Sequence, residues 1–163
     1  MLALALCAAP SLGQEDPWGL RLQGGANVAR QDCDRACQQA RLVCVVFSHA
    51  GSKAFRAEDL TDDRNLPWGQ IDFAMLASMV SDRKDIDPSV IADGSRRSGP
   101  QVVSFADHDW VHADYDFVSG SRNYAITLLL WPDKSVTRGL RCSYAATSDP
   151  ADQIRAWAGE VRR

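Results

Sequence analysis

Residues 107–116 contain the densest group of side chains that could carry out chemistry. The segment reads Asp-His-Asp-Trp-Val-His-Ala-Asp-Tyr-Asp and holds two of the three histidines of the chain. Histidine and aspartate together can bind a metal ion or transfer protons near neutral pH. Side chains alternate along a β-strand, so an extended segment would place five of these groups on one face. They are His108, Trp110, His112, Asp114 and Asp116.

The spacing within this face limits which residues can act together. On an extended strand His108 and His112 lie about 13 Å apart, because each residue advances the chain by about 3.3 Å. His112 and Asp114 are only two residues apart and could share an ion if another element supplied a third ligand. The pattern is compatible with a solvated strand face, with a metal site, and with acid or base chemistry at His112. We assign no catalytic or metal-ligating residue and expect no cofactor.

Trp110 is a candidate contact residue. The chain has five tryptophans, and the alternation predicts that Trp110 lies on the polar face of its strand. Large aromatic rings among polar groups are favoured anchors at protein interfaces and in ligand grooves. A tail or helix of the same chain could also cover the ring. We therefore predict that Trp110, His112 and Asp114 are binding residues.

Other catalytic motifs are missing from the sequence. Ser48-His49 lacks the two flanking glycines of a G-x-S-x-G nucleophile elbow. The cysteines form no C-x-x-C redox pair, and no G-x-x-x-x-G-K-[ST] phosphate loop occurs. With 163 residues, a net charge of −3 and 45% hydrophobic residues, the composition indicates one soluble globular domain. It does not favour nucleic acid as a partner, because that would require a concentrated basic surface.

The first thirteen residues resemble a secretory signal. Residues 1–9 are uninterrupted apolar residues, and small residues follow at Ser11 and Gly13. The run is much shorter than the roughly 20 residues of a membrane-spanning helix. We predict a signal peptide at residues 1–13 and a single domain at residues 14–163. We also predict a periplasmic or secreted location and no transmembrane segment.

Four cysteines remain after the predicted cleavage, and export would allow them to form disulfides. They are Cys33, Cys37, Cys44 and Cys142. Residues 27–41 have helical periodicity, and residues four apart on a helix have Cβ atoms about 5 to 6 Å apart. A disulfide needs about 3.8 Å. We therefore expect Cys33 and Cys37 to bond to Cys44 and Cys142, in an order that the spacing leaves open.

Several elements must position these residues. An apolar strand at residues 42–47 is expected to pair in a hairpin with residues 53–57, and a deeply buried helix follows at residues 67–80. Residues 87–94 predict a short helix and residues 95–100 a loop. Three strands after the strand at 101–106 form a meander, and residues 149–161 form a helix with one apolar stripe. The fold class is therefore α+β, with a mostly antiparallel sheet of about five or six strands and helices packed on it.

The order of elements over residues 87–163 is similar to that of PsbP and Mog1-like domains. The shared order is a short helix, a three-strand meander and a closing helix. That resemblance implies the fold of those domains and an accessory or binding role. It transfers no functional residue, because function depends on the site and not on the fold.

Three functions are compatible with these observations. The first is an exported, non-catalytic accessory or binding domain that recognises a protein or a small ligand near Trp110, His112 and Asp114. The second is a metal-assisted hydrolase that uses His112, Asp114 and a third ligand such as His108. The third is an inhibitor or immunity-type protein that blocks a partner enzyme in the cell envelope.

Overall fold

The computed structural model describes residues 21–22, 41–50, 55–83, 86, 92–134 and 136–162. The predicted signal peptide at residues 1–13 lies outside the described residues. So do Cys33, Cys37 and all but the last residue of the predicted helix at 27–41.

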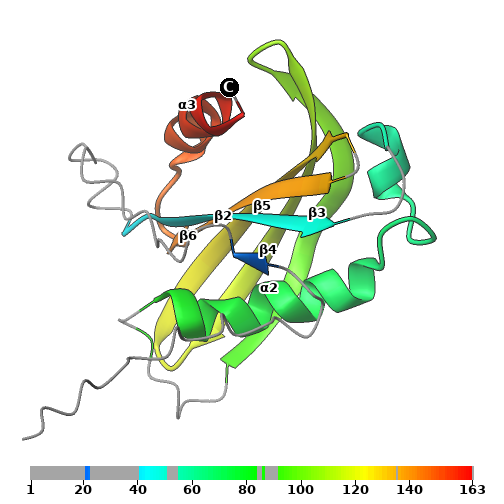
Figure 1. Cartoon of the computed structure of the whole chain (residues 1–163). Coiled ribbons are helices and arrows are strands. Elements are labelled where there is room, and N and C mark those ends of the chain that lie inside the picture. Colours follow the sequence, from blue (N-terminus) through cyan, green and yellow to red (C-terminus); the bar gives the residue numbers. More distant parts are fainter. Residues whose placement is uncertain are drawn as a thin grey trace, which may run out of the picture.

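The framework is a six-stranded antiparallel sheet, with strand order β1-β2-β6-β5-β4-β3 (Figure 1). The predicted α+β class is confirmed. The strands are β1 (Arg21–Leu22), β2 (Val43–Ala50), β3 (Ala92–Phe105), β4 (His108–Ser119), β5 (Arg122–Asp133) and β6 (Val136–Ala145). The predicted meander corresponds to β4, β5 and β6, which pair in sequence order.

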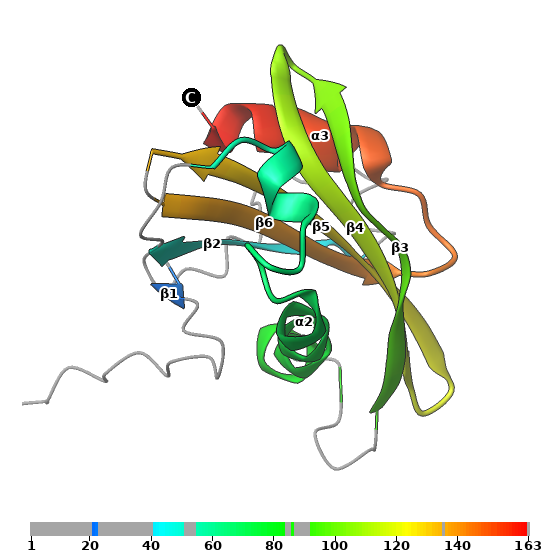
Figure 2. The ribbon, with the colours of Figure 1, turned by 90° about the vertical axis from the view of Figure 1, so that its right-hand side faces the viewer.

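Helices cover the two faces of this sheet. The 3-10 helix η1 (Glu58–Thr61) and helix α2 (Trp68–Asp82) pack on one face, and helix α3 (Ala151–Val161) packs on the other (Figure 2). The sheet is thus the middle of three layers. No helix among the described residues is long and apolar enough to cross a membrane.

The first core lies between the sheet and α2. Every second residue of β4 from Val111 to Phe117 is buried there, as the alternation predicts. Helix α2 buries one face only: Ile71 and Met75 are buried, whereas Phe73 is 65% exposed. The expectation of a deeply buried helix at residues 67–80 is therefore wrong. It lies at the surface of the molecule, so one of its sides must face water.

The second core lies between the sheet and α3. It contains the apolar stripe of the helix, Ile154, Trp157 and Ala158, as predicted from the sequence. From the sheet it receives Trp110, Trp131 and Leu129 among others. Because both faces of β5 are covered, eight consecutive residues from Tyr124 to Trp131 are buried.

Strand β3 corrects two local predictions. Residues 92–94 do not belong to a helix and residues 95–100 do not form a loop, because all of them lie in β3. They pair with β4 from Ala92↔Ser119 onward. The register shifts between Arg96 and Gln101, where Gly99 has a φ of +80°. Such irregularities accommodate glycine and proline on an edge strand, which the local composition suggested was a loop.

The predicted hairpin of residues 42–47 with 53–57 is also wrong. Strand β2 pairs with β1 on one side and with β6 on the other, and residues 55–57 belong to no strand. Phe47 lies opposite Gly139 of β6, and a Cβ at Gly139 would overlap the Phe47 ring. This long-range fit places β2 beside β6.

A disulfide joins the same two strands and corrects the expected cysteine pairing. Cys44 and Cys142 are direct partners in the β2–β6 register, with Cα atoms 4.0 Å apart and 98 positions apart in sequence. The expectation that each would bond to Cys33 or Cys37 is wrong. The spacing of the cysteines in the sequence does not show which strands are neighbours in the sheet, and the β2–β6 pairing brings Cys44 to Cys142.

This disulfide leads to a prediction about stability. A bond that closes a loop of this length restricts the unfolded chain strongly. Replacing both Cys44 and Cys142 with alanine should lower the free energy of unfolding by about 2 to 5 kcal/mol, as measured by urea denaturation. Non-reducing peptide mapping should link Cys44 to Cys142. A map that joins either residue to Cys33 or Cys37 would contradict the structure.

Candidate functional site

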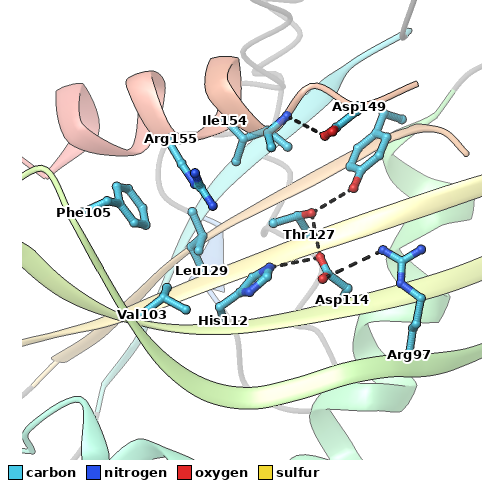
Figure 3. A pocket seen from close by; sticks show the side chains of 12 residues that line it. Arg97, Val103, Phe105, His112, Asp114, Thr127, Leu129, Asp149, Ile154 and Arg155 are labelled. Atoms are coloured by element: carbon cyan, nitrogen blue, oxygen red, sulfur yellow. Dashed lines mark hydrogen bonds and ion pairs between the residues drawn. The ribbon is translucent and has the colours of Figure 1, made fainter. Parts of the chain in front are cut away.

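A pocket of about 180 Å³ lies between the sheet and the first turns of α3 (Figure 3). Strands β4, β5 and β6 form its floor, β3 forms one side, and α3 with the segment before it forms the roof. The lining residues are Arg97, Val103, Phe105, His112, Asp114, Thr127, Leu129, Tyr144, Asp149, Ala151, Ile154 and Arg155.

Strand pairing brings the polar part of the floor together. Asp114 of β4 lies directly opposite Thr127 of β5, and His112 lies opposite Leu129. Residues that face each other across antiparallel strands have Cβ atoms about 4.5 to 5.5 Å apart. The side chains of Asp114 and Thr127 therefore meet on the face that α3 covers.

Asp114 is the centre of a hydrogen-bond network. Its Oδ1 lies 3.0 Å from Nε2 of His112 and 2.9 Å from the Thr127 hydroxyl. Its Oδ2 accepts a hydrogen bond of 3.0 Å from the Ser98 hydroxyl. The guanidinium of Arg97 lies 3.9 Å away. Only 16% of the Asp114 side chain is exposed, so this carboxylate depends mainly on its protein partners for hydrogen bonds.

These partners determine the charge of Asp114. Burial raises the pKa of Asp114, but the hydrogen bond and electrostatic attraction of His112, with hydrogen bonds from Thr127 and Ser98, outweigh that effect. The net result lowers the pKa from an ordinary value of 3.8 to about 2. Asp114 is therefore a carboxylate throughout the physiological pH range.

The charge of Asp114 also determines which group donates in each hydrogen bond of the network. An ionised carboxylate can only accept hydrogen bonds, so the Thr127 hydroxyl donates to Asp114. Thr127 must then accept its 3.1 Å hydrogen bond from the Tyr144 hydroxyl. Burial raises the pKa of Tyr144, which keeps this phenol protonated as a donor. By the same argument, Nε2 of His112 carries a hydrogen.

The rest of the pocket is apolar, with charged groups above it. Val103, Leu129 and Ile154 line this part. Figure 3 shows Arg155 extending from α3 toward the sheet, and its guanidinium carbon lies 6.0 Å from the centre of the Phe105 ring. Asp149 accepts a hydrogen bond of 3.3 Å from the backbone N–H of Ala151, at the start of α3. The pocket thus has a polar side and an apolar side.

The structure unites two of the three binding residues named from the sequence. His112 and Asp114 share one strand face and are in direct contact. Trp110 does not lie on a wet face, because it is fully buried, and this part of the prediction is wrong. Its ring stacks on Phe105 and lies under the guanidinium of Arg162, which follows α3. A helix of the same chain covers it, which was the alternative.

Sequence reasoning did not identify several residues of the site, including Arg97, Thr127, Tyr144 and Arg155. Only Thr127 had a usable signal, since it is the one polar residue in the apolar run from Tyr124 to Trp131. A polar group in a buried strand requires a partner. The other three come from β3, β6 and α3, and only tertiary packing brings them to β4.

The described residues contain no group of three or more histidine, cysteine, aspartate or glutamate side chains that could hold a metal ion. In this part of the chain, His112 and Asp114 therefore have no third ligand. His108 begins β4, and its ring lies beside Trp110, with centroids 6.4 Å apart.

No protein-family model matches the chain, and a comparison with curated proteins finds no match. The function is therefore argued from the site itself.

The network predicts an acid-dependent contribution to stability. The folded-state pKa of Asp114 is about 2, below the ordinary 3.8, so its contribution is complete above pH 3.8 and is lost as pH falls toward 2. Asp114→Asn should lower the free energy of unfolding at pH 7 by about 2 kcal/mol. Urea denaturation at pH 7, 4 and 2.5 should show that the difference from the unsubstituted protein shrinks with acidity.

Asp116→Asn is the matched control, because Asp116 lies on the same strand with a half-exposed carboxylate that pairs with Arg97 at the surface. Exposed ion pairs contribute little to stability. An equal loss at pH 7 in both variants would contradict a special role for Asp114.

Proposed function

We propose that this protein is an exported, non-catalytic binding domain that holds a small organic ligand in the pocket beneath α3. The observation that carries the proposal is the pairing of a fixed polar network at Asp114 with an apolar side formed by Val103, Leu129 and Ile154. Ligand pockets commonly have this construction, in which apolar side chains supply contact area and a few polar groups set orientation.

The hydrogen bonds favour binding over catalysis. A nucleophilic hydroxyl needs a general base within hydrogen-bond distance. The hydroxyls of Thr127 and Ser98 both donate to Asp114, and a carboxylate whose pKa is lowered to about 2 is too weak a base to activate them. The ionised carboxylate orients these groups firmly, which suits a preformed binding surface.

Two observations support export. The Cys44–Cys142 disulfide is of a kind that persists mainly in oxidising compartments such as the periplasm or the cell exterior. The apolar residues 1–9, followed by small residues, resemble a cleaved leader. A periplasmic or secreted location is consistent with both.

An accessory role is a more specific version of the proposed binding function. The meander β4-β5-β6 followed by α3 retains part of the element order of PsbP and Mog1-like domains. The comparison remains an analogy, since residues 92–94 are strand and not helix.

Filling the pocket should weaken ligand binding. Ala151 lines the pocket at the start of α3, so Ala151→Phe should weaken small compounds from a fragment library at least tenfold. The measurement is NMR titration, with shifts at Asp114, Thr127 and Leu129 as the readout. Ala156→Phe is the matched control, because Ala156 is exposed on the same helix and should leave binding unchanged.

Several outcomes would contradict a binding role. Finding no compound that shifts the pocket resonances would remove the proposal. Turnover of a hydrolase substrate that is lost in His112→Ala would favour an enzyme. A stoichiometric metal ion in protein purified without chelator would favour the metal-assisted hydrolase. Capture of an envelope enzyme that is inhibited on binding would favour the inhibitor.

Export has its own test. Expression of the full chain in a bacterial host should yield a periplasmic or secreted protein whose first residue is Gln14, because cleavage is expected after Gly13. Amino-terminal sequencing of the fractionated protein measures this directly. Retention in the cytoplasm with residues 1–13 attached would disprove the proposed location.

A further inference from the structure

We infer that the pocket recognises a small carboxylate, with Arg155 as the group that binds the anion. This inference rests on the proposed binding function and names the chemical class of the ligand. The candidates are a free carboxylic acid and the carboxyl terminus of a peptide, which present the same group.

The first argument is the distribution of charge around the pocket. His112 is paired with Asp114, and Arg97 lies 2.9 Å from Asp116. Asp149 is held by the backbone N–H of Ala151. Among the described residues, Arg155 is the one charged side chain of the pocket that has no partner of opposite charge or hydrogen-bond partner.

The second argument is the position of Arg155. Its guanidinium lies over the Phe105 ring and points from the roof of the pocket toward the sheet (Figure 3). A guanidinium offers five N–H donors in a planar fork that fits the two oxygens of a carboxylate. An anion there would bind Arg155, because the donors of the polar floor are already used by Asp114. The guanidinium of Arg97, 3.9 Å from Asp114, offsets part of the negative charge of that carboxylate.

The third argument is the apolar surface beside this cation. Leu129 and Ile154 lie next to Arg155 in the pocket wall, with Val103 from β3 (Figure 3). A ligand that neutralises Arg155 would therefore also place a short apolar body against these residues. The volume of about 180 Å³ limits that body to a few carbon atoms or one small ring.

The test compares acids with their neutral amides. We would titrate the oxidised protein with butyrate and butyramide, and with benzoate and benzamide, at low salt. N-acetyl-dialanine with a free or an amidated carboxyl terminus represents the peptide. NMR shifts of pocket amides give each Kd. Every acid that binds should do so at least tenfold more tightly than its amide, because hydrogen bonds to charged groups are stronger than neutral ones.

Arg155→Gln keeps a hydrogen-bond donor but removes the charge, so it should reduce the affinity for the acid to that for the amide. Arg56→Gln is the matched control. Arg56 is exposed and precedes η1, on the face of the sheet opposite the pocket, and its substitution should leave every Kd unchanged. Tighter binding of the peptide acid than of the small acids would identify a carboxyl terminus as the ligand, and the reverse would identify a free acid.

The outcomes separate this inference from the proposed function. If amides bind the pocket as tightly as acids, or Arg155→Gln binds acids as well as the unsubstituted protein, carboxylate recognition is disproved and a neutral ligand remains. If neutral library compounds bind and no acid does, the inference also fails while the binding function stands. If no compound of either kind shifts the pocket resonances, both fail.

Discussion

Removal of both faces of the central sheet from water is the constraint on which the rest of the structure depends. Strand β5 is buried on both sides from Tyr124 to Trp131, so each face needs its own covering helix. Helix α2 covers one face and the shorter α3 covers the other. Apolar burial stabilises both layers by about 25 cal/mol for each Å² removed from water. The pocket lies where the start of α3 leaves part of its face open.

That arrangement explains why the polar network is so complete. A carboxylate beneath a covering helix loses most of its hydration, and an unpaired buried charge is costly. Asp114 offsets this cost with His112, Thr127 and Ser98, and the same contacts keep it ionised. Its charge then fixes the orientation of Thr127 and, through it, of Tyr144. The stability of the sheet and the preorganisation of the pocket therefore depend on the same hydrogen bonds.

The disulfide fixes the position of one edge of the sheet and agrees with the proposed export. Cys44 and Cys142 tie β2 to β6, two strands that are far apart in sequence but adjacent in the sheet. Pairing of distant strands requires closing a long loop, which costs conformational entropy. A disulfide at that point reduces this cost because it restricts the unfolded chain, and it persists mainly under oxidising conditions. The disulfide is therefore consistent with the proposed export.

Local periodicity determined which residues share a face in β4, in the central strand β5 and in α3, and it placed His112 beside Asp114. Only the tertiary structure decided what covers each face: α3 buries Trp110, and β6 supplies the partner of Cys44. It also drew the polar residues 92–100 into a strand, because pairing with β4 outweighs their weak β-propensity. The physical reason is that side-chain alternation repeats over two residues, whereas the choice of neighbouring strands depends on contacts between residues tens of positions apart.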